Sequence, residues 1–255
     1  MILSRVIEHV KKQHWTAIFI DFAIVVVGVF IGMQVTNWNE ARAERALEAG
    51  YLGSLKEDID YSTQKLRNMI QSMEEQQVAR ETLYAYVTDP NSTMEAAARD
   101  RLIFIGMFIL PQVDISEVTF ETLKSSGRLS LLRNPALVTE LQSLSSNVAS
   151  ALRDQADEVQ VTYLFSDPLL VANVDMAGVF RQKSLNGRKN NIPWLKDAPD
   201  TAPTPQAMRT QQFANAVLYR SFFTYGRLLS AGSMLEQHQR IAKLIRARQA
   251  ELGGG

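Results

Sequence analysis

The stretch WTAIFIDFAIVVVGVFIGMQVT, residues 15–36, decides how this chain is built. It is almost entirely apolar, and Asp21 is its only ionisable residue. As a helix rising about 1.5 Å per residue, the stretch covers about 30 Å, which is the thickness of a hydrocarbon core. A helix also pairs its own backbone amides and carbonyls, as a lipid environment requires. The sequence therefore predicts a single transmembrane helix over residues 15–36.

Basic residues on either side of this stretch predict its orientation. Arg5, Lys11 and Lys12 precede it, whereas Arg42 and Arg45 follow it among glutamates. Because cytoplasmic flanks carry the excess of Lys and Arg, we expect the amino-terminal tail inside and the bulk of the chain outside. A cleaved signal peptide is the alternative. The apolar run is longer than the ~7–15 residues of a signal-peptide core, which favours a retained anchor.

One face of the predicted span is small and polar. At 100° per residue, Asp21, Gly28, Gly32 and Asn39 fall within about 40° of one another. Two glycines four residues apart allow a second helix backbone to approach closely. Glycine pairs at this spacing also arise by chance in apolar segments, but their alignment with Asp21 favours a contact face.

Asp21 places an acid inside the span. An acid at the bilayer centre costs about 2.5–3.5 kcal/mol, and Asp21 lies only about 8 Å from the start of the span, where the cost is lower. Burial in lipid favours the protonated acid, which suits a partner helix or a proton path. The alternative is an acid that contacts interfacial water or pairs with Lys12 or His14.

The outer end of the span is marked by Asn37, Trp38, Asn39 and Glu40, because Trp favours headgroup depth and polar residues favour water. No proline interrupts residues 40–87, so the helix is expected to continue as a stalk over residues 37–88. The stalk carries a seam at 3-4 spacing that could pack on a second copy or on the chain's own domain, the second being favoured. The seam residues are Leu52, Leu55, Ile59, Ser62, Leu66, Met69 and Met73.

Turn and capping signals divide residues 92–252 into further helices, so the predicted fold is all-α. A proline turn at 89–91 ends the stalk, and Ser92 to Glu95 reads as a capping box. Asn134-Pro135 and Asp167-Pro168 read as helix starts. The expected helices are 92–110 with a buried core portion at 101–110, 116–127 capped by Ser116, 134–165 through Leu141, Leu144, Val148 and Leu152, and 213–252; residues 181–205 are expected as a loop.

Two blocks of sequence carry a resemblance. IDFAIVVVGVFIGMQVTNWNEARAERALEAGYLGSLKEDI, residues 20–59, joins an intramembrane acid to the Asn-Trp-Asn-Glu junction, and VTFETLKSSGRLSLLRNPALVTELQSL, residues 118–144, contains Leu-Lys-Ser-Ser-Gly. Together they resemble an uncharacterised family of single-pass bacterial membrane proteins. The resemblance implies an inner-membrane anchor with a periplasmic domain, and it implies no activity.

Composition and motifs exclude several function classes. The chain has 27 basic and 27 acidic residues, which leaves no excess of positive charge for nucleic acid, and it has no cysteine. Its histidines, at positions 9, 14 and 238, cannot form a metal site within the domain, and no phosphate loop, nucleophile elbow or dinucleotide fingerprint occurs. We therefore expect no enzyme activity, no cofactor and no metal. A basic loop at 181–189 reads as solvated, and the aromatics at 219–225 read as core.

These observations favour a membrane-anchored scaffold or interaction module. Its expected partners are the lipid bilayer and either a second copy or another membrane protein, met through the span. The alternative is a single-pass subunit of a proton-driven complex, similar in outline to stator subunits, in which Asp21 takes and releases the coupling proton. A multi-pass partner that purifies with the chain would favour this alternative.

Overall fold

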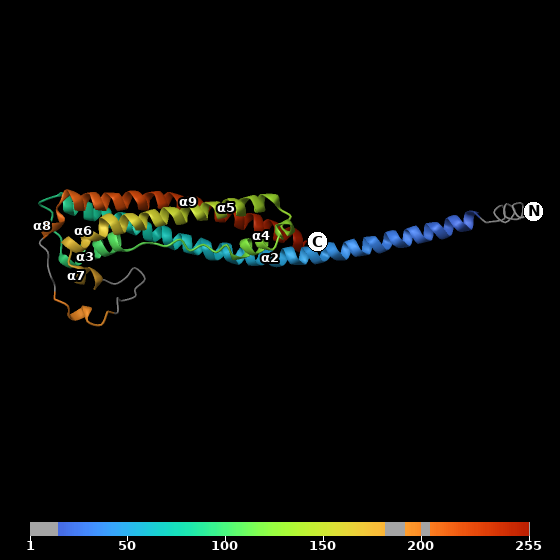
Figure 1. The fold of residues 1–255 in the computed structure, drawn as a ribbon, viewed down its shortest axis with the longest axis horizontal. Coiled ribbons are helices and arrows are strands. Elements are labelled where there is room, and N and C mark those ends of the chain that lie inside the picture. Colours follow the sequence, from blue (N-terminus) through green and yellow to red (C-terminus); the bar gives the residue numbers. More distant parts are fainter. Residues whose placement is uncertain (1–14, 182–191, 200–204, 255) are drawn as a thin grey trace, which may run out of the picture. The chain divides into compact units, whose positions relative to one another are not determined.

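The structure is a computed structural model that describes residues 15–181, 192–199 and 205–254. Every regular element in these ranges is helical, which confirms the all-α prediction (Figure 1). The chain divides into two compact units, Met1–Tyr51 and Leu52–Gly255. The predicted tail, residues 1–14, lies outside the described residues. The α-helices are α2 (Trp15–Thr88), α3 (Ala96–Ile103), α4 (Val118–Ser125), α5 (Pro135–Val161), α6 (Asp167–Asn173), α7 (Met176–Phe180), α8 (Pro205–Met208) and α9 (Gln211–Gly253).

Helix α2 ends at Thr88, as the proline turn at 89–91 predicts. All seven residues of its predicted seam, from Leu52 to Met73, are buried. Since these residues belong to the second unit, the seam packs on the chain's own helices, and a second copy is not needed to bury it. From Leu52 onward, the segment expected as a stalk is thus part of the helical bundle.

Helices α5 and α9 lie beside the second half of α2 and complete the bundle (Figure 1). Helix α5 starts as predicted: the Asn134 side chain accepts hydrogen bonds from the amides of Ala136 and Leu137 at 3.0 and 3.2 Å, and Pro135 takes the first helical position. Leu152 is 46% exposed, contrary to the predicted core stripe, because Ala151 faces the bundle instead. Helix α9 starts two residues before the predicted start, where the Thr210 hydroxyl accepts from the Phe213 amide.

The predicted cap at Ser116 is wrong: α4 begins at Val118, and Asp58 of α2 caps it instead. Asp58 accepts hydrogen bonds from the Ser116 hydroxyl at 2.6 Å and from the Thr119 amide at 2.9 Å. Burial alone raises the pKa of the Asp58 carboxyl, but these donors outweigh burial and leave the pKa below its ordinary value. The predicted stop at Gly127 is confirmed: its φ of 69° is left-handed, which only glycine adopts readily.

The predicted capping box at Ser92 to Glu95 is wrong, because α3 begins only at Ala96 and Glu95 makes no side-chain cap. Residues before it are held in a turn: the Asp89 carboxylate accepts from the Asn91 amide, and the Arg209 guanidinium binds the carbonyls of Pro90 and Ser92. These contacts hold the chain before α3 in a non-helical conformation, and Glu95 itself is extended.

Two π-helical turns follow α3 and α5. The first, η1 (Phe104–Phe108), replaces the end of the predicted core helix, and the chain is extended from Ile109. The second, η3 (Thr162–Ser166), leads directly into α6, which starts at Asp167 with Pro168 in its first turn as predicted, although Ser166 before it is also helical. The wider π turn accommodates Pro168, which has no amide hydrogen to donate. Short 3-10 turns, η2 (Leu129–Leu131) and η4 (Leu195–Asp197), complete the elements.

Candidate functional site

The apolar part of α2 in the first unit is uncovered by the described chain. From Phe19 to Thr36, every described side chain is exposed except the half-buried Ala23, and Phe19, Phe22 and Phe30 are 70%, 66% and 60% exposed. The helix is long and apolar enough to cross a membrane, and none of the apolar window is buried inside the structure. Because burying large side chains is worth about 1.5–3 kcal/mol each, such a surface favours lipid over water.

The predicted contact face lies on this uncovered helix. A side chain built at Gly28 or Gly32 meets no atom within 4 Å, and the Thr36 hydroxyl donates to the Gly32 carbonyl at 3.1 Å. No contact inside the described chain therefore requires glycine at either position. Asp21 lies in the same helix, but its side chain is outside what the structure describes.

The predicted boundary residues Asn37, Trp38, Asn39 and Glu40 are helical and exposed. Trp38 is 61% exposed, and the Arg42 guanidinium lies 5.7 Å from the centre of its ring. A cation beside an indole ring suits the headgroup region, where one side of the ring meets lipid and the other meets water.

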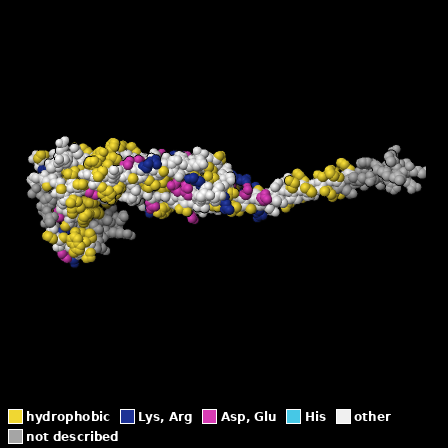
Figure 2. Space-filling model, in the orientation of Figure 1, with side chains coloured by type: hydrophobic (Ala, Val, Ile, Leu, Met, Phe, Trp, Pro, Cys, Tyr) yellow, Lys and Arg dark blue, Asp and Glu magenta, His cyan; other side chains and the backbone are white. Residues whose placement is uncertain are grey.

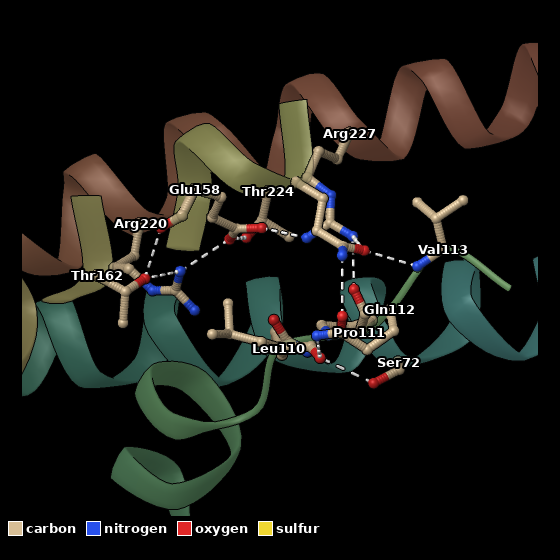
Figure 3. A network of polar contacts seen from close by, with 12 residues as sticks. Ser72, Leu110, Pro111, Gln112, Val113, Glu158, Thr162, Arg220, Thr224 and Arg227 are labelled. Carbon is tan, nitrogen blue, oxygen red and sulfur yellow. Dashed lines mark hydrogen bonds and ion pairs between the residues drawn. The ribbon is translucent and has the colours of Figure 1, made fainter. Parts of the chain in front are cut away.

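The second unit holds a buried polar cluster that the sequence did not reveal (Figure 3). Glu158 of α5 is 1% exposed and is bound by Arg220, Thr224 and Arg227 of α9. Arg220 Nη1 lies 2.9 Å from one Glu158 oxygen and 2.6 Å from the Thr162 hydroxyl. Burial alone raises the pKa of the Glu158 carboxyl, but Arg220, Thr224 and Arg227 together hold it below its ordinary value. The carboxylate thus stays charged and joins α5 to α9.

The cluster extends to α2 and to the segment after η1. Arg80 is fully buried and donates to the Gly106 carbonyl at 2.6 Å and to Gln76 at 2.9 Å. Arg227 donates to the Pro111 carbonyl at 2.5 Å. Burial, with a contribution from the positive charge of Arg220, lowers the pKa of Arg80 to about 9. Three guanidiniums therefore surround one carboxylate, and both π-helical turns, η1 and η3, supply acceptors to them.

This arrangement is built to hold helices together. Each oxygen of Glu158 accepts a hydrogen bond from a side chain of α9, which ties α5 to that helix. In the described part of the chain, no group of three His, Cys, Asp or Glu side chains could hold a metal ion.

The aromatics at 219–225 are the clearest error of the sequence analysis, because most of them are exposed rather than buried. Tyr219, Phe222 and Tyr225 are 47%, 71% and 56% exposed, and Leu218 and Leu229 on the same side are 47% and 58% exposed. The core side of α9 is formed instead by residues such as Val217, Arg220, Thr224 and Arg227. The 4-3-4 spacing of Leu218, Phe222, Tyr225 and Leu229 could have shown that these residues share one side of the helix.

These residues continue onto the neighbouring η3 turn. The Phe165 and Tyr219 rings meet edge to face with centroids 6.2 Å apart. An open groove of about 810 Å³ runs beside them, with Phe165 and Leu169 on one side and Leu218, Tyr219 and Phe222 on the other. We call Phe165, Leu218, Tyr219, Phe222, Tyr225 and Leu229 the apolar face. Figure 2 shows hydrophobic side chains gathered over the end of the second unit where α6 and the start of α9 lie.

Comparison of the chain with known protein families, curated proteins and solved structures finds no match.

Proposed function

We propose that this chain is a membrane-anchored scaffold or interaction module of the bacterial inner membrane. Residues 15–36 cross the bilayer, the amino terminus is cytoplasmic, and the second unit works in the periplasm. The observation that carries the proposal is the apolar length of α2 in the first unit, which is exposed throughout its described side chains. The second unit buries its own seam and core, so it does not need the span to cover it.

The span is also the first proposed contact with a partner. Gly28 and Gly32 meet nothing inside the described chain, so their small size serves a contact outside it. Helices in lipid associate through close packing at such small residues. A second copy or another membrane protein fits this face, with Asp21 beside it as a group that can hydrogen-bond across helices.

Membrane insertion and orientation are tested on the full chain. The chain should stay with the membrane pellet after alkaline carbonate extraction, because a spanning helix is held by lipid rather than by charge. A reporter enzyme that is active only in the periplasm, fused to the carboxyl terminus, should be active. Release by carbonate would contradict the anchor, and activity of a reporter that works only in the cytoplasm would contradict the orientation.

The glycine face is tested by adding bulk. Gly28→Ile with Gly32→Ile should reduce cross-linking of the chain to its partner in membranes at least several-fold, while insertion is unchanged. Val26→Ile with Val27→Ile is the matched control, because these residues point away from the glycines and also gain only apolar volume. Equal cross-linking in both variants would show that the glycines are incidental.

A further inference from the structure

We propose that the apolar face is a docking site for a second copy of this chain, with α9 packing against α9. This inference deepens the proposed scaffold function and rests on it in one respect, the shared membrane. Two copies anchored in one membrane meet at a raised effective concentration, so a modest face suffices to pair them.

The spacing of the apolar face is that of a helix seam. Asn215, Leu218, Phe222, Tyr225 and Leu229 follow one another at intervals of three and four residues, and all are exposed. Apolar residues that repeat in this way pack against a second helix of the same kind. The opposite side of α9 already packs on α5, so this seam is a second, unused one.

The face is large enough to supply most of one side of a protein contact. An aromatic side chain has about 150–250 Å² of surface, so six large side chains that are about half exposed leave on the order of 500–600 Å² open. That value is at the upper end for the largest apolar patch of a monomer. With its polar rim, the face approaches the roughly 800 Å² that each partner contributes to a standard interface.

The absence of exposed charge from this side of α9 suits a second copy of the chain as its occupant. Between Gln211 and Leu235, the charged residues of α9 are Arg220 and Arg227, and both are buried in the polar cluster. A face without exposed charge brings no like charges together when it meets itself, and it offers no ion pair to select a different partner. Asn215 suits the same pairing, because its amide carries both donors and an acceptor and can bond its counterpart. Glu236, the next exposed charge, marks where the seam ends.

Cysteine cross-linking of the full chain in membranes tests the pairing. The chain has no cysteine, so each introduced thiol reports on one position. Phe222→Cys, Tyr225→Cys and Leu229→Cys should each give disulfide-linked dimer under mild oxidation if the helices run in the same direction. If they run in opposite directions about Tyr225, only Tyr225→Cys should cross-link, which also supports the second copy. Val78→Cys, at an exposed apolar site on α2, is the control and should give at least tenfold less dimer.

A charge exchange gives a second measurement that does not depend on oxidation. Tyr225→Glu and Tyr225→Lys should each lose at least tenfold in affinity-captured tagged dimer, because Tyr225 meets its copy in either direction and like charges would then meet at the seam. When both variants are expressed together, capture should recover, since opposite charges then meet. Tyr225 is 56% exposed, so neither change should unfold the chain, and unchanged circular dichroism checks this.

The outcomes separate this inference from the proposed function. No dimer at any of the three cysteines, or cross-linking to a different polypeptide only, would overturn the inference while membrane anchoring stands. Loss of the chain from carbonate-washed membranes would overturn the proposed function, whatever the cross-linking of α9 shows.

Discussion

Removal of a single residue of the polar cluster should destabilise the second unit. Glu158 is the only carboxylate that binds the buried Arg220 and Arg227 among the described ion pairs, so it supplies the one negative charge that both guanidiniums share. A buried ion pair adds little compared with well-packed apolar residues, but removal of one partner leaves the other charge buried and uncompensated.

Glu158→Gln should therefore destabilise the chain by about 3–5 kcal/mol, measured by denaturant unfolding in mild detergent. The control is Glu121→Gln, which breaks an exposed pair with Lys124 of α4 and should change stability by less than about 0.5 kcal/mol. Similar losses in the two variants would contradict a structural role for the cluster.

His238 should make stability depend on pH. Burial lowers the pKa of its imidazole below the ordinary value of 6.5, although its hydrogen bond with the Met234 carbonyl opposes the shift. The folded state then binds the proton less readily than the unfolded state, so stability is full above pH 6.5 and falls as the pH decreases below it. Unfolding midpoints measured from pH 7.5 to 5.5 should fall, and His238→Met should flatten that slope. An unchanged slope in His238→Met would assign the effect to other groups.

At the residue scale, the sequence predicted a residue's role only where adjacent residues determine that role. Asn134 before Pro135 is a local signal, and it caps α5 as expected. Glu158 and Arg220 are separated by 62 positions, so no spacing in the sequence shows that they meet. The charge of Arg220 and Arg227 also concealed the core side of α9, because charged residues ordinarily face water.

At the scale of elements, long helices were predictable and their junctions were not. The seam of α2 and the apolar stripe of α5 follow the helical period over many residues, so burial obeys the pattern everywhere except at Leu152. The start of α3 instead depends on Arg209, which lies more than a hundred positions later in the chain. The two π turns likewise contact residues distant in sequence, since Gly106 accepts from Arg80 and Thr162 accepts from Arg220.

The contact of α7 with α3 depends on one glycine. A Cβ at Gly178 would lie 2.3 Å from an oxygen of Asp100, which is 5% exposed. Gly178→Ala should therefore displace this carboxylate and cost about 1–3 kcal/mol, measured by thermal unfolding. Gly53→Ala, in open space on α2, is the control and should stabilise by up to about 1 kcal/mol. A rise of the midpoint in both variants would contradict the close approach.

At the scale of the whole molecule, the two units differ in how their apolar side chains are covered. The second unit has a continuous core of buried residues from α2, α3, α6, α7 and α9, whereas the apolar residues of the first unit have no cover within the described chain. One unit is suited to water and the other to lipid.

A chain that begins at Ala43 should therefore stay in the soluble fraction and keep its helical circular dichroism. The full chain should pellet with membranes under the same conditions. Aggregation of the shortened chain with loss of helix signal would show that the second unit needs the span for its fold.

The order in which the chain is made has a consequence for this bundle. Its core joins the first long helix to the last: Leu83 of α2 lies in one cluster with Phe213 and Val217 of α9, and Gln77 donates to the Ser221 carbonyl. Contacts between residues so distant in sequence form late, after the intervening chain has been synthesised. The part of α2 from Gln77 to Leu83 therefore emerges first and lacks these contacts until α9 follows. If the span is inserted as proposed, termination within α9 would leave this apolar surface of α2 open on a chain held at the membrane, which favours aggregation.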